Sequence, residues 1–274
     1  MSNIRGAQVL ITGGASGIGR LMVEECLRRG ARRVIIWDMN PDPLADRVRS
    51  WVSEGHQVIL KAIDITHTEE VRKAATAITE RLGPVDILIN NAGIITGKLF
   101  EDHTHAEIDR TMQVNSQAMM HITLAFLPAM LLAGRGHLVN IASAAGMASN
   151  PQMSVYVASK WAVIGWSESV RLELEAKGGD FHVTTVTPFY ISTGMFDGVR
   201  SPIVPIVRPD RAARKILDDV ERNRMFSRMP WIVHAMPFFR GILPQRWFDV
   251  LIGKWFGIHE SMRGFRGRCE KRTD

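Results

Sequence analysis

The chain has 274 residues, of which 46% are hydrophobic, 23% charged and 7% aromatic. These ordinary fractions exclude a disordered or collagen-like chain, and the length allows one large domain with a substantial core. The net charge of +6 is unevenly placed, because residues 199–274 carry +8 and residues 1–198 carry −2.

The number of cysteines and the length of the apolar stretches indicate the cellular compartment of the protein. Cys26 and Cys269 are too few for a disulfide framework, and no Cys/His cluster has zinc spacing, so no metal site is expected. No window reaches the roughly 18 consecutive apolar residues of a spanning helix. No charged-then-apolar leader is expected either, because a strand-like segment begins by Ala7. These features predict a reducing, cytoplasmic location.

The first 190 residues alternate between short β-branched segments and longer helical patterns. The expected strands are 9–11, 33–37, 57–60, 86–89, 137–141 and 182–186, and the expected helices are 17–29, 42–54, 68–82, 107–132 and 155–175. The strands are continuous apolar runs, which is typical of strands covered on both faces. The pattern predicts an α/β fold: a single doubly wound, Rossmann-type parallel sheet with helices on both faces.

The remaining residues are expected to belong to the same domain, which would span residues 1–274. No linker is long enough to separate two domains, and Pro202, Pro205 and Pro209 indicate only a loop after the sixth strand. Residues 196–274 would then form a loop and a helical C-terminal extension that is basic and rich in aromatic residues.

A glycine-rich segment, Thr12-Gly13-Gly14-Ala15-Ser16-Gly17-Ile18-Gly19, connects the first strand to the first helix. Glycines let a backbone approach a pyrophosphate, whose charge the helix N-terminus stabilises. Asp38 lies 19 residues after Gly19, where a carboxylate accepts hydrogen bonds from the adenosine ribose and repels a 2′-phosphate. NAD is therefore expected to be preferred over NADP. Three arginines oppose that preference in part: Arg20, Arg32 and Arg33.

Further motifs follow in chain order: Asp64-Ile65 after the third strand, Asn90-Asn91-Ala92-Gly93 after the fourth, Asn115 in the long helix, Ser143 after the fifth strand, and Tyr156-x-x-x-Lys160. With these motifs in register, the chain resembles the short-chain dehydrogenase/reductase family over residues 5 to about 195. The resemblance implies an oxidoreductase that interconverts a hydroxyl and a carbonyl with a nicotinamide cofactor. It also implies that Asp64-Ile65 contact the adenine and that Asn91, Ala92 and Gly93 contact the cofactor.

The Tyr156–Lys160 pair supplies the expected acid–base chemistry. A spacing of four places both side chains on one helical face. A nearby ammonium and the positive nicotinamide ring would lower the phenol pKa from ~10, so that Tyr156 acts as general acid or base. Ser143 would donate a hydrogen bond to the reacting oxygen. Resemblance further implies that Lys160 binds the nicotinamide ribose and that Asn115 holds a water in a proton relay.

The segment after the sixth strand departs from the family pattern. It reads Pro188-Phe189-Tyr190-Ile191-Ser192-Thr193 where the family usually has Pro-Gly, so a bulky ring is expected beside the nicotinamide. Pro188, Ile191 and Thr193 remain suited to cofactor contacts. With the following Gly194-Met195-Phe196, the turn resembles the retinol and 17β-hydroxysteroid dehydrogenases, which commonly carry an N-terminal membrane anchor that is not expected here. The resemblance implies a lipophilic alcohol as substrate.

Apolar and aromatic residues after the turn support that substrate. Six apolar residues are expected to close over the pocket: Met195, Phe196, Ile203, Val204, Ile206 and Val207. Seven aromatic residues are interleaved with basic ones in the extension: Trp231, Phe238, Phe239, Trp247, Phe248, Trp255 and Phe256, with Arg240, Arg246 and Lys254. This mixture suits a pocket wall or peripheral contact with a membrane better than nucleic acid, which is not expected. Packing of the aromatics onto the body is an open alternative.

Two other functions remain open at this stage. One is an NADPH-dependent carbonyl reductase of small ketones, and the other is a non-catalytic cofactor-binding module that docks on a membrane or a protein. In each case the family resemblance implies a homodimer or homotetramer. Apolar positions of the Tyr156 helix give modest support for a subunit contact: Val155, Ala158, Ala162 and Trp166.

Overall fold

The structure is a computed structural model and describes residues 2–267. Its seven parallel strands form one sheet with the order β3-β2-β1-β4-β5-β6-β7. The strands are β1 (Gln8–Thr12), β2 (Arg33–Asp38), β3 (Val58–Ala62), β4 (Ile87–Asn90), β5 (Arg135–Ile141), β6 (Asp180–Pro188) and β7 (Phe226–Met229). The direction of winding reverses between β1 and β4. The carboxyl ends of these strands therefore flank the crevice where open α/β sheets bind ligands.

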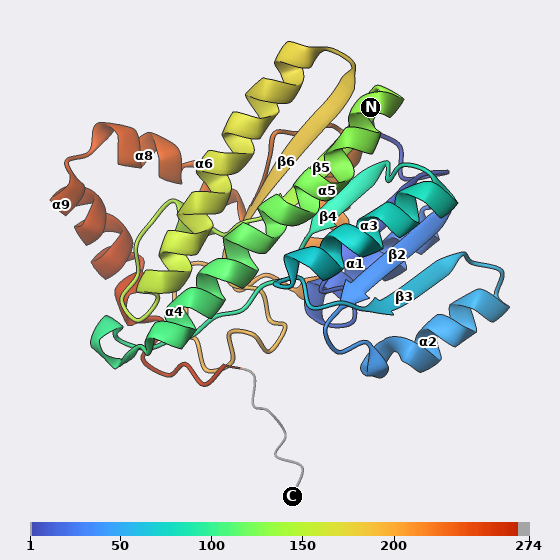
Figure 1. Cartoon of the computed structure of the whole chain (residues 1–274). Helices are drawn as coiled ribbons and strands as arrows, with labels where there is room; N and C mark the ends of the chain where they lie inside the picture. Colours follow the sequence, from blue (N-terminus) through green and yellow to red (C-terminus); the bar gives the residue numbers. More distant parts are fainter. Residues whose placement is uncertain (1, 268–274) are drawn as a thin grey trace, which may run out of the picture.

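Helices cover both faces of the sheet, as its continuous apolar strands predict. Val9 and Ile11 of β1 pack into one core with α1, α2 and α7, whereas Leu10 packs into the opposite core with α3, α5 and α6. Figure 1 shows the second layer in front of the sheet. The principal helices are α1 (Gly17–Arg28), α2 (Asp42–Ser53), α3 (Thr68–Leu82), α4 (His105–Met112), α5 (Ala118–Ala133), α6 (Ser154–Lys177) and α7 (Pro209–Glu221).

The six expected strands are confirmed, with three differences elsewhere. A seventh strand, β7, pairs in parallel with β6 and was not expected. The helical region expected over 107–132 is interrupted by a π-helical turn at Gln113–Gln117, which separates α4 from α5. Pro209 does not lie in a loop but occupies the first position of α7, where a missing N–H costs nothing.

Residues 231–262 form a group of short helices that we call the C-terminal lobe. Its elements are η4 (Trp231–His234), α8 (Met236–Ile242), α9 (Gln245–Asp249), the π-helical η5 (Val250–Trp255) and η6 (Ile258–Glu260). In Figure 1, α8 and α9 lie to one side of the sheet, beyond α6. The Arg240 guanidinium ties the lobe to the body, since it donates to the Met147 carbonyl at 2.9 Å and stacks 4.3 Å from the Trp161 ring. Cys269 lies outside the described residues.

Among the described residues, the helical stretch His105–Ala133 is long and apolar enough to cross a membrane, judged by length and composition alone. It contains no unbroken apolar run of the length sought in the sequence. The same stretch contains the π turn and Asn115. Ile122, Phe126 and Met130 of α5 pack into the sheet core. In this fold one face of the stretch therefore belongs to the core beside the sheet.

Candidate active site

The glycine-rich turn between β1 and α1 has a conformation that requires its glycines. Gly13 and Gly17 adopt left-handed backbone angles, with φ of +63° and +56°. A Cβ at Gly19 would collide with the Gly13 carbonyl oxygen and lie 2.6 Å from the Asn91 amide nitrogen. The turn is therefore packed tightly, with its backbone exposed toward the crevice.

Two polar side chains hold this turn in place. The Asn91 amide donates to the carbonyl oxygens of Thr12 at 2.9 Å and Gly13 at 3.0 Å. One carboxylate oxygen of Asp38 accepts the Ala15 N–H at 2.9 Å. A carboxylate has about four acceptor sites, so Asp38 can still accept hydrogen bonds from a ligand.

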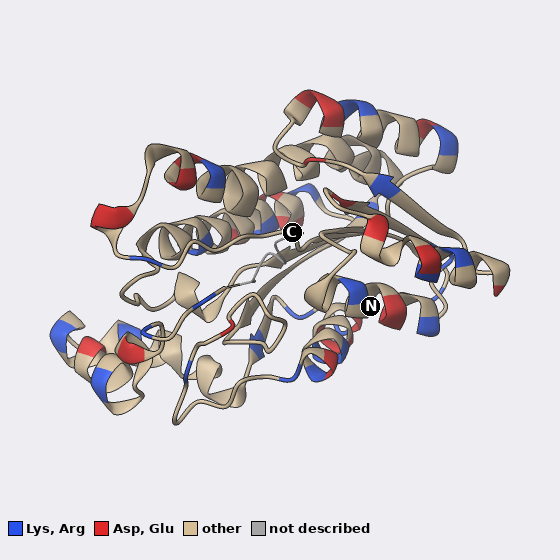
Figure 2. Ribbon diagram, turned by 90° about the horizontal axis from the view of Figure 1, so that it is seen from below, with Lys and Arg blue, Asp and Glu red and all other residues tan. Residues whose placement is uncertain are grey.

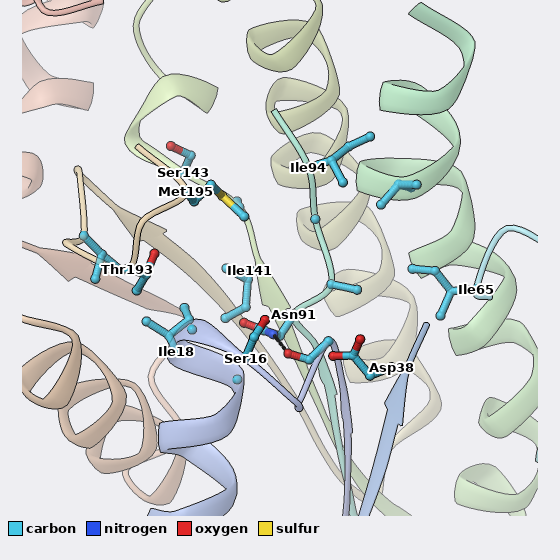
Figure 3. A pocket seen from close by; sticks show the side chains of 18 of the residues that line it. Ser16, Ile18, Asp38, Ile65, Asn91, Ile94, Ile141, Ser143, Thr193 and Met195 are labelled. Atoms are coloured by element: carbon cyan, nitrogen blue, oxygen red, sulfur yellow. Dashed lines mark hydrogen bonds between the residues drawn. The ribbon is translucent and has the colours of Figure 1, made fainter. Parts of the chain in front are cut away.

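A cavity of about 250 Å³ extends from this turn across the carboxyl ends of the strands. Figure 3 shows Asp38 and Ile65 at one end and Ser143 and Met195 toward the other. Every expected cofactor or catalytic residue except Asn115 lines it: Gly13, Ser16, Gly17, Ile18, Gly19, Asp38, Asp64, Ile65, Asn91, Ala92, Gly93, Ser143, Tyr156, Lys160, Pro188, Ile191 and Thr193.

Lys160 is buried in α6, and its ammonium donates to the Ile141 carbonyl at 2.8 Å. Burial lowers the pKa of Lys160 to about 8, so most of the amine is still protonated at pH 7. Only one of its three N–H donors is used by the residues that the structure describes. Two donors are left for a ligand in the cavity.

Tyr156 lies on the same buried face of α6, and the Lys160 nitrogen is 5.7 Å from the centre of its ring. Burial raises the pKa of Tyr156, and hydrogen bonding with Ser143 acts in the opposite direction. The expected lowering of this pKa is therefore not a property of the polypeptide alone. Burial raises this pKa more than the Ser143 hydrogen bond lowers it, so a further positive charge is needed to favour the phenolate.

Ser143 follows β5 and begins the short helix η3 (Ala144–Gly146), where its hydroxyl oxygen accepts the Ala145 N–H at 3.1 Å. This contact fixes the side chain at the cavity wall. A serine hydroxyl both donates and accepts, so it can still donate to a ligand oxygen.

Asn115 lies behind the cavity wall. The π turn directs its side chain inward, where the oxygen accepts the Ile94 N–H at 2.8 Å. Its amide donates to the Ile94 carbonyl at 2.9 Å and to the Ser159 hydroxyl at 3.1 Å. The side-chain oxygen would lie 3.3 Å from a Cβ on Gly93, and the Lys160 nitrogen would lie 3.8 Å from the same point. Asn115 thus fixes the segment that faces Lys160.

Asp64 lies at the end of the cavity near Asp38, and several residues without a sequence motif complete the rest of the wall. Burial would raise the pKa of Asp64, but hydrogen bonds from the backbone and hydroxyl of Thr66 lower it below its ordinary value. Sequence reasoning missed the other wall residues: Trp37, Met39, Ile63, Ile94, Arg110, Val114, Ile141 and Ala142. Trp37, Ile141 and Ala142 could have been found, because they lie at the ends of expected strands. The position of Arg110 on α4 depends on tertiary packing and has no such signal.

The six residues of the expected substrate loop lie in four different environments. Met195 and Phe196 line the cavity, and Val204 lines a separate hollow under the C-terminal lobe. Ile203 and Ile206 are exposed, so they do not close over the pocket in this conformation. Val207 packs against the core that the sheet forms with α1, α2 and α7.

Two of the four residues expected on a subunit face of α6 lie elsewhere. Val155 is buried and Trp166 packs against the sheet core. Ala158 is exposed and Ala162 is half-buried. The exposed side of α6 also carries Trp161, and Arg240 covers one face of its ring.

Comparison with known proteins identifies the class of this fold and site. The family model described as short chain dehydrogenase matches residues 7–203. The chain belongs to the short-chain dehydrogenase/reductase family. It is accordingly an oxidoreductase that acts on CH–OH groups with a nicotinamide cofactor.

Within this family the chain is similar to retinol dehydrogenases. Mouse epidermal retinol dehydrogenase 2 is 36% identical over 98% of this chain and 88% of its own length. Human short-chain dehydrogenase/reductase 3 is 35% identical over 95% of this chain and 86% of its own length.

Solved structures have the same fold and a bound cofactor. A short-chain dehydrogenase/reductase from Burkholderia phymatum in complex with NAD is 25% identical, with a TM-score of 0.77 over 92% of this chain and 96% of that one. A short-chain dehydrogenase from Burkholderia cenocepacia in complex with NADP is 27% identical, with a TM-score of 0.77 over 92% and 98%.

The residues of the cavity fit a dinucleotide. The glycine turn presents backbone without side chains at the N-terminus of α1, where a pyrophosphate is stabilised. Asp38 lies at one end for a ribose, and Lys160 keeps two unused donors at the other. The cavity therefore supplies a partner for each polar part of the cofactor.

Proposed function

We propose that this protein oxidises a lipophilic alcohol, or reduces the corresponding carbonyl compound, with Tyr156 as the proton donor and acceptor. The observation that carries the proposal is the meeting of Tyr156, Lys160 and Ser143 in the same cavity as the glycine-rich turn. The bound nicotinamide accepts or gives the hydride and places a positive charge in the site when oxidised.

The residues of the chain perform the proton chemistry. Ser143 donates a hydrogen bond that positions the reacting oxygen, and Tyr156 takes its proton in the oxidative direction. The Lys160 ammonium stabilises the phenolate and binds the nicotinamide ribose with its unused donors. Asn115 fixes the Ile94 segment and holds a water that connects Lys160 to solvent.

The remaining expected residues bind the cofactor. Gly13, Ser16, Gly17, Ile18 and Gly19 would hold the pyrophosphate. Asp64, Ile65, Asn91, Ala92 and Gly93 would line the adenosine side, and Pro188, Ile191 and Thr193 would contact the carboxamide. Their common position on the cavity wall supports this assignment.

The cofactor is NAD in preference to NADP. Asp38 lies on the cavity wall with free acceptor sites, and its charge repels a 2′-phosphate. The arginines that opposed this preference point to other partners. Arg33 donates to Gln8 and Gln57, Arg20 pairs with Glu24, and Arg32 pairs with Asp86.

The substrate is a lipophilic alcohol of retinoid, steroid or long-chain type. Phe189, Met195 and Phe196 form an apolar wall beside Ser143 and Tyr156, and the Phe196 ring lies edge-on to Tyr156 at 6.1 Å. The retinol dehydrogenases among the relatives are consistent with such a ligand.

A turnover screen with NAD and NADP tests the function. The substrates are retinol, 1-decanol, a hydroxysteroid and 1-butanol, each in both directions. The proposal predicts faster turnover of the apolar alcohols with NAD. Preferential reduction of small polar ketones with NADPH would contradict it, and so would the absence of turnover with every substrate.

The C-terminal lobe rests on a lipid surface at the cytoplasmic side of a membrane. Trp231, Trp247 and Trp255 are 78%, 69% and 71% exposed, and Arg246 and Lys254 are exposed beside them. Tryptophan with basic side chains suits the interface of an anionic bilayer. Figure 2 shows that charges of both signs alternate over the outer helices, which favours this local surface over a nucleic-acid groove.

Vesicle sedimentation tests this contact. Wild type should sediment with vesicles that contain phosphatidylserine and less with pure phosphatidylcholine, and Trp247→Ser with Trp255→Ser should remove sedimentation. Val52→Ser replaces an exposed apolar side chain on α2, away from the lobe, and is the matched control. Equal sedimentation of all variants would contradict the contact. A change of oligomeric state without lipid binding would assign the lobe to a contact between copies.

The protein forms a homodimer or homotetramer. Leu124 and Leu132 of α5 and Trp161 of α6 are large apolar side chains on exposed helix faces. Sedimentation equilibrium tests this assembly, and a monomer at micromolar concentration would contradict it.

A further inference from the structure

An apolar hollow of about 130 Å³ lies beneath the C-terminal lobe, apart from the main cavity. All eleven side chains that line it are apolar, and they come from the segment after β6 and from the C-terminal lobe. An apolar cavity of roughly 150 Å³ stays dry and accepts a benzene-sized ligand. The hollow therefore has the volume and the chemistry to take part of a hydrocarbon chain.

Phe189 connects this hollow to the reacting groups. It lines the main cavity, the hollow under the lobe, and a narrow space of about 30 Å³ between them. The narrow space has Ser143 on its wall, and it shares Met236 and Ile258 with the hollow under the lobe. One path thus begins at Ser143, passes Phe189 and ends beneath the lobe. Its wall is apolar except for Ser143, Asn150 and Tyr190 in the narrow space.

The position of the Phe189 ring is held from two sides. Its N–H donates to the Met229 carbonyl of β7 at 2.8 Å, which fixes the backbone. The ring packs edge-on against Tyr190 with 4.6 Å between ring centres. The Phe189 side chain is therefore a fixed partition, and the cross-section of the path depends on its size.

We propose that the hollow under the lobe binds the apolar tail of the alcohol, and that Phe189 is the specificity-determining residue that sets how far the tail reaches. This inference rests on the proposed function, because the hydroxyl of the same molecule must lie at Ser143 and Tyr156. A tail in this hollow is removed from water and contacts only apolar side chains, so each buried methylene adds about fourfold to kcat/KM.

A chain-length series of primary alcohols from 1-butanol to 1-dodecanol tests the proposal in the absence of lipid. Wild type should show kcat/KM that rises about fourfold per methylene until the hollow is filled. Ala235→Phe places a ring in the hollow and should keep butanol turnover within about twofold while it lowers decanol turnover about tenfold or more. Phe189→Ala should move the optimum to longer or bulkier alcohols.

Ile242→Phe is the matched control, because Ile242 is exposed on α8 and does not line the hollow. It should reproduce the wild-type series. Retained butanol turnover shows that Ala235→Phe and Ile242→Phe are folded, and a wild-type thermal unfolding profile shows the same for Phe189→Ala. The tail site would be overturned if kcat/KM depended on chain length in the same way in wild type and Ala235→Phe, and if the optimal chain length were unchanged in Phe189→Ala.

A binding measurement distinguishes failure of the tail site from failure of the proposed function. If wild type oxidises no alcohol, the proposed function is wrong, and calorimetric titration with 1-decanol in the presence of NADH still decides the tail site. Binding at least tenfold tighter to wild type than to Ala235→Phe supports the hollow as an apolar site. Equal binding overturns it.

Discussion

The ammonium nitrogen of Lys160 lies 5.7 Å from the centre of the Tyr156 ring, and both side chains are buried on one face of α6. Burial moves their pKa values in opposite directions, with that of Lys160 lowered to about 8 and that of Tyr156 raised. Both shifts favour the uncharged forms. The pair therefore holds a neutral phenol until another positive charge enters the site.

Replacement of Lys160 by methionine should weaken both cofactor binding and turnover. The change removes the two donors available to the ribose and the charge beside Tyr156. We expect the Kd for NADH to rise about tenfold or more, measured by fluorescence titration, with a further loss in kcat. Unchanged cofactor affinity would show that the ammonium does not contact the cofactor.

Asp38→Ala should weaken NAD(H) binding much more than NADP(H) binding. The substitution removes the acceptor for the ribose hydroxyls and also the repulsion of a 2′-phosphate. It also removes the Ala15 contact, so Asp38→Asn serves as a control that keeps an acceptor for that N–H. Titration with both cofactors measures the effect. Equal losses for NAD(H) and NADP(H) would rule out Asp38 as the selecting residue.

Gly19→Ala should abolish cofactor binding, since its Cβ collides with the Gly13 carbonyl oxygen and displaces the turn. Gly165→Ala is the matched control on α6, because a Cβ there has no neighbour within 4 Å. The control should gain about 0.5–1 kcal/mol in stability from its better helix propensity. Calorimetry with NADH and thermal unfolding measure the two effects. Normal NADH affinity in Gly19→Ala would contradict the tight turn.

Acid should destabilise the fold through His137. Burial and the neighbouring His182 imidazole, 5.5 Å away, lower the pKa of His137 to about 3 from 6.5. The unfolded chain binds more protons between these values, so stability falls as the pH decreases from 6.5 to 3, by up to about 1.4 kcal/mol per pH unit.

Urea unfolding at a series of pH values measures this loss. His137→Gln keeps a polar partner for Ser2 and Thr184 and should give a shallower dependence on pH. His121→Gln, on the exposed side of α5, should keep the wild-type slope. A slope that is identical in all three proteins would exclude His137 as the source.

The sequence predicted most of the fold because the buried strands are continuous apolar runs with helical segments between them. β7 escaped detection since it has only four residues, includes Arg228 and pairs along one edge with β6 alone. The π turn at Asn115 has no periodic signal of its own. Its geometry follows from the hydrogen bonds of Asn115 with Ile94 and Ser159.

The cofactor end of the site could be predicted because its residues lie in short motifs at strand ends. The C-terminal lobe could not be predicted, because its packing depends on contacts between residues that are distant in the sequence. Arg240 was expected on a basic surface, yet it is held between the Met147 carbonyl and the Trp161 ring. The sequence indicated a bulky Phe189 beside the nicotinamide, but only the structure shows that this ring separates two hollows.

The most direct measurement compares turnover and NADH affinity in Tyr156→Phe and Tyr190→Phe. These are the two tyrosines of the chain, and the Tyr190 hydroxyl is already bonded to Ser261 at 2.8 Å. Loss of the proton-transfer group should lower kcat in Tyr156→Phe by about 10²- to 10⁴-fold with unchanged NADH affinity, while Tyr190→Phe stays within a few-fold of wild type. Turnover of Tyr156→Phe within a few-fold of wild type would contradict the account.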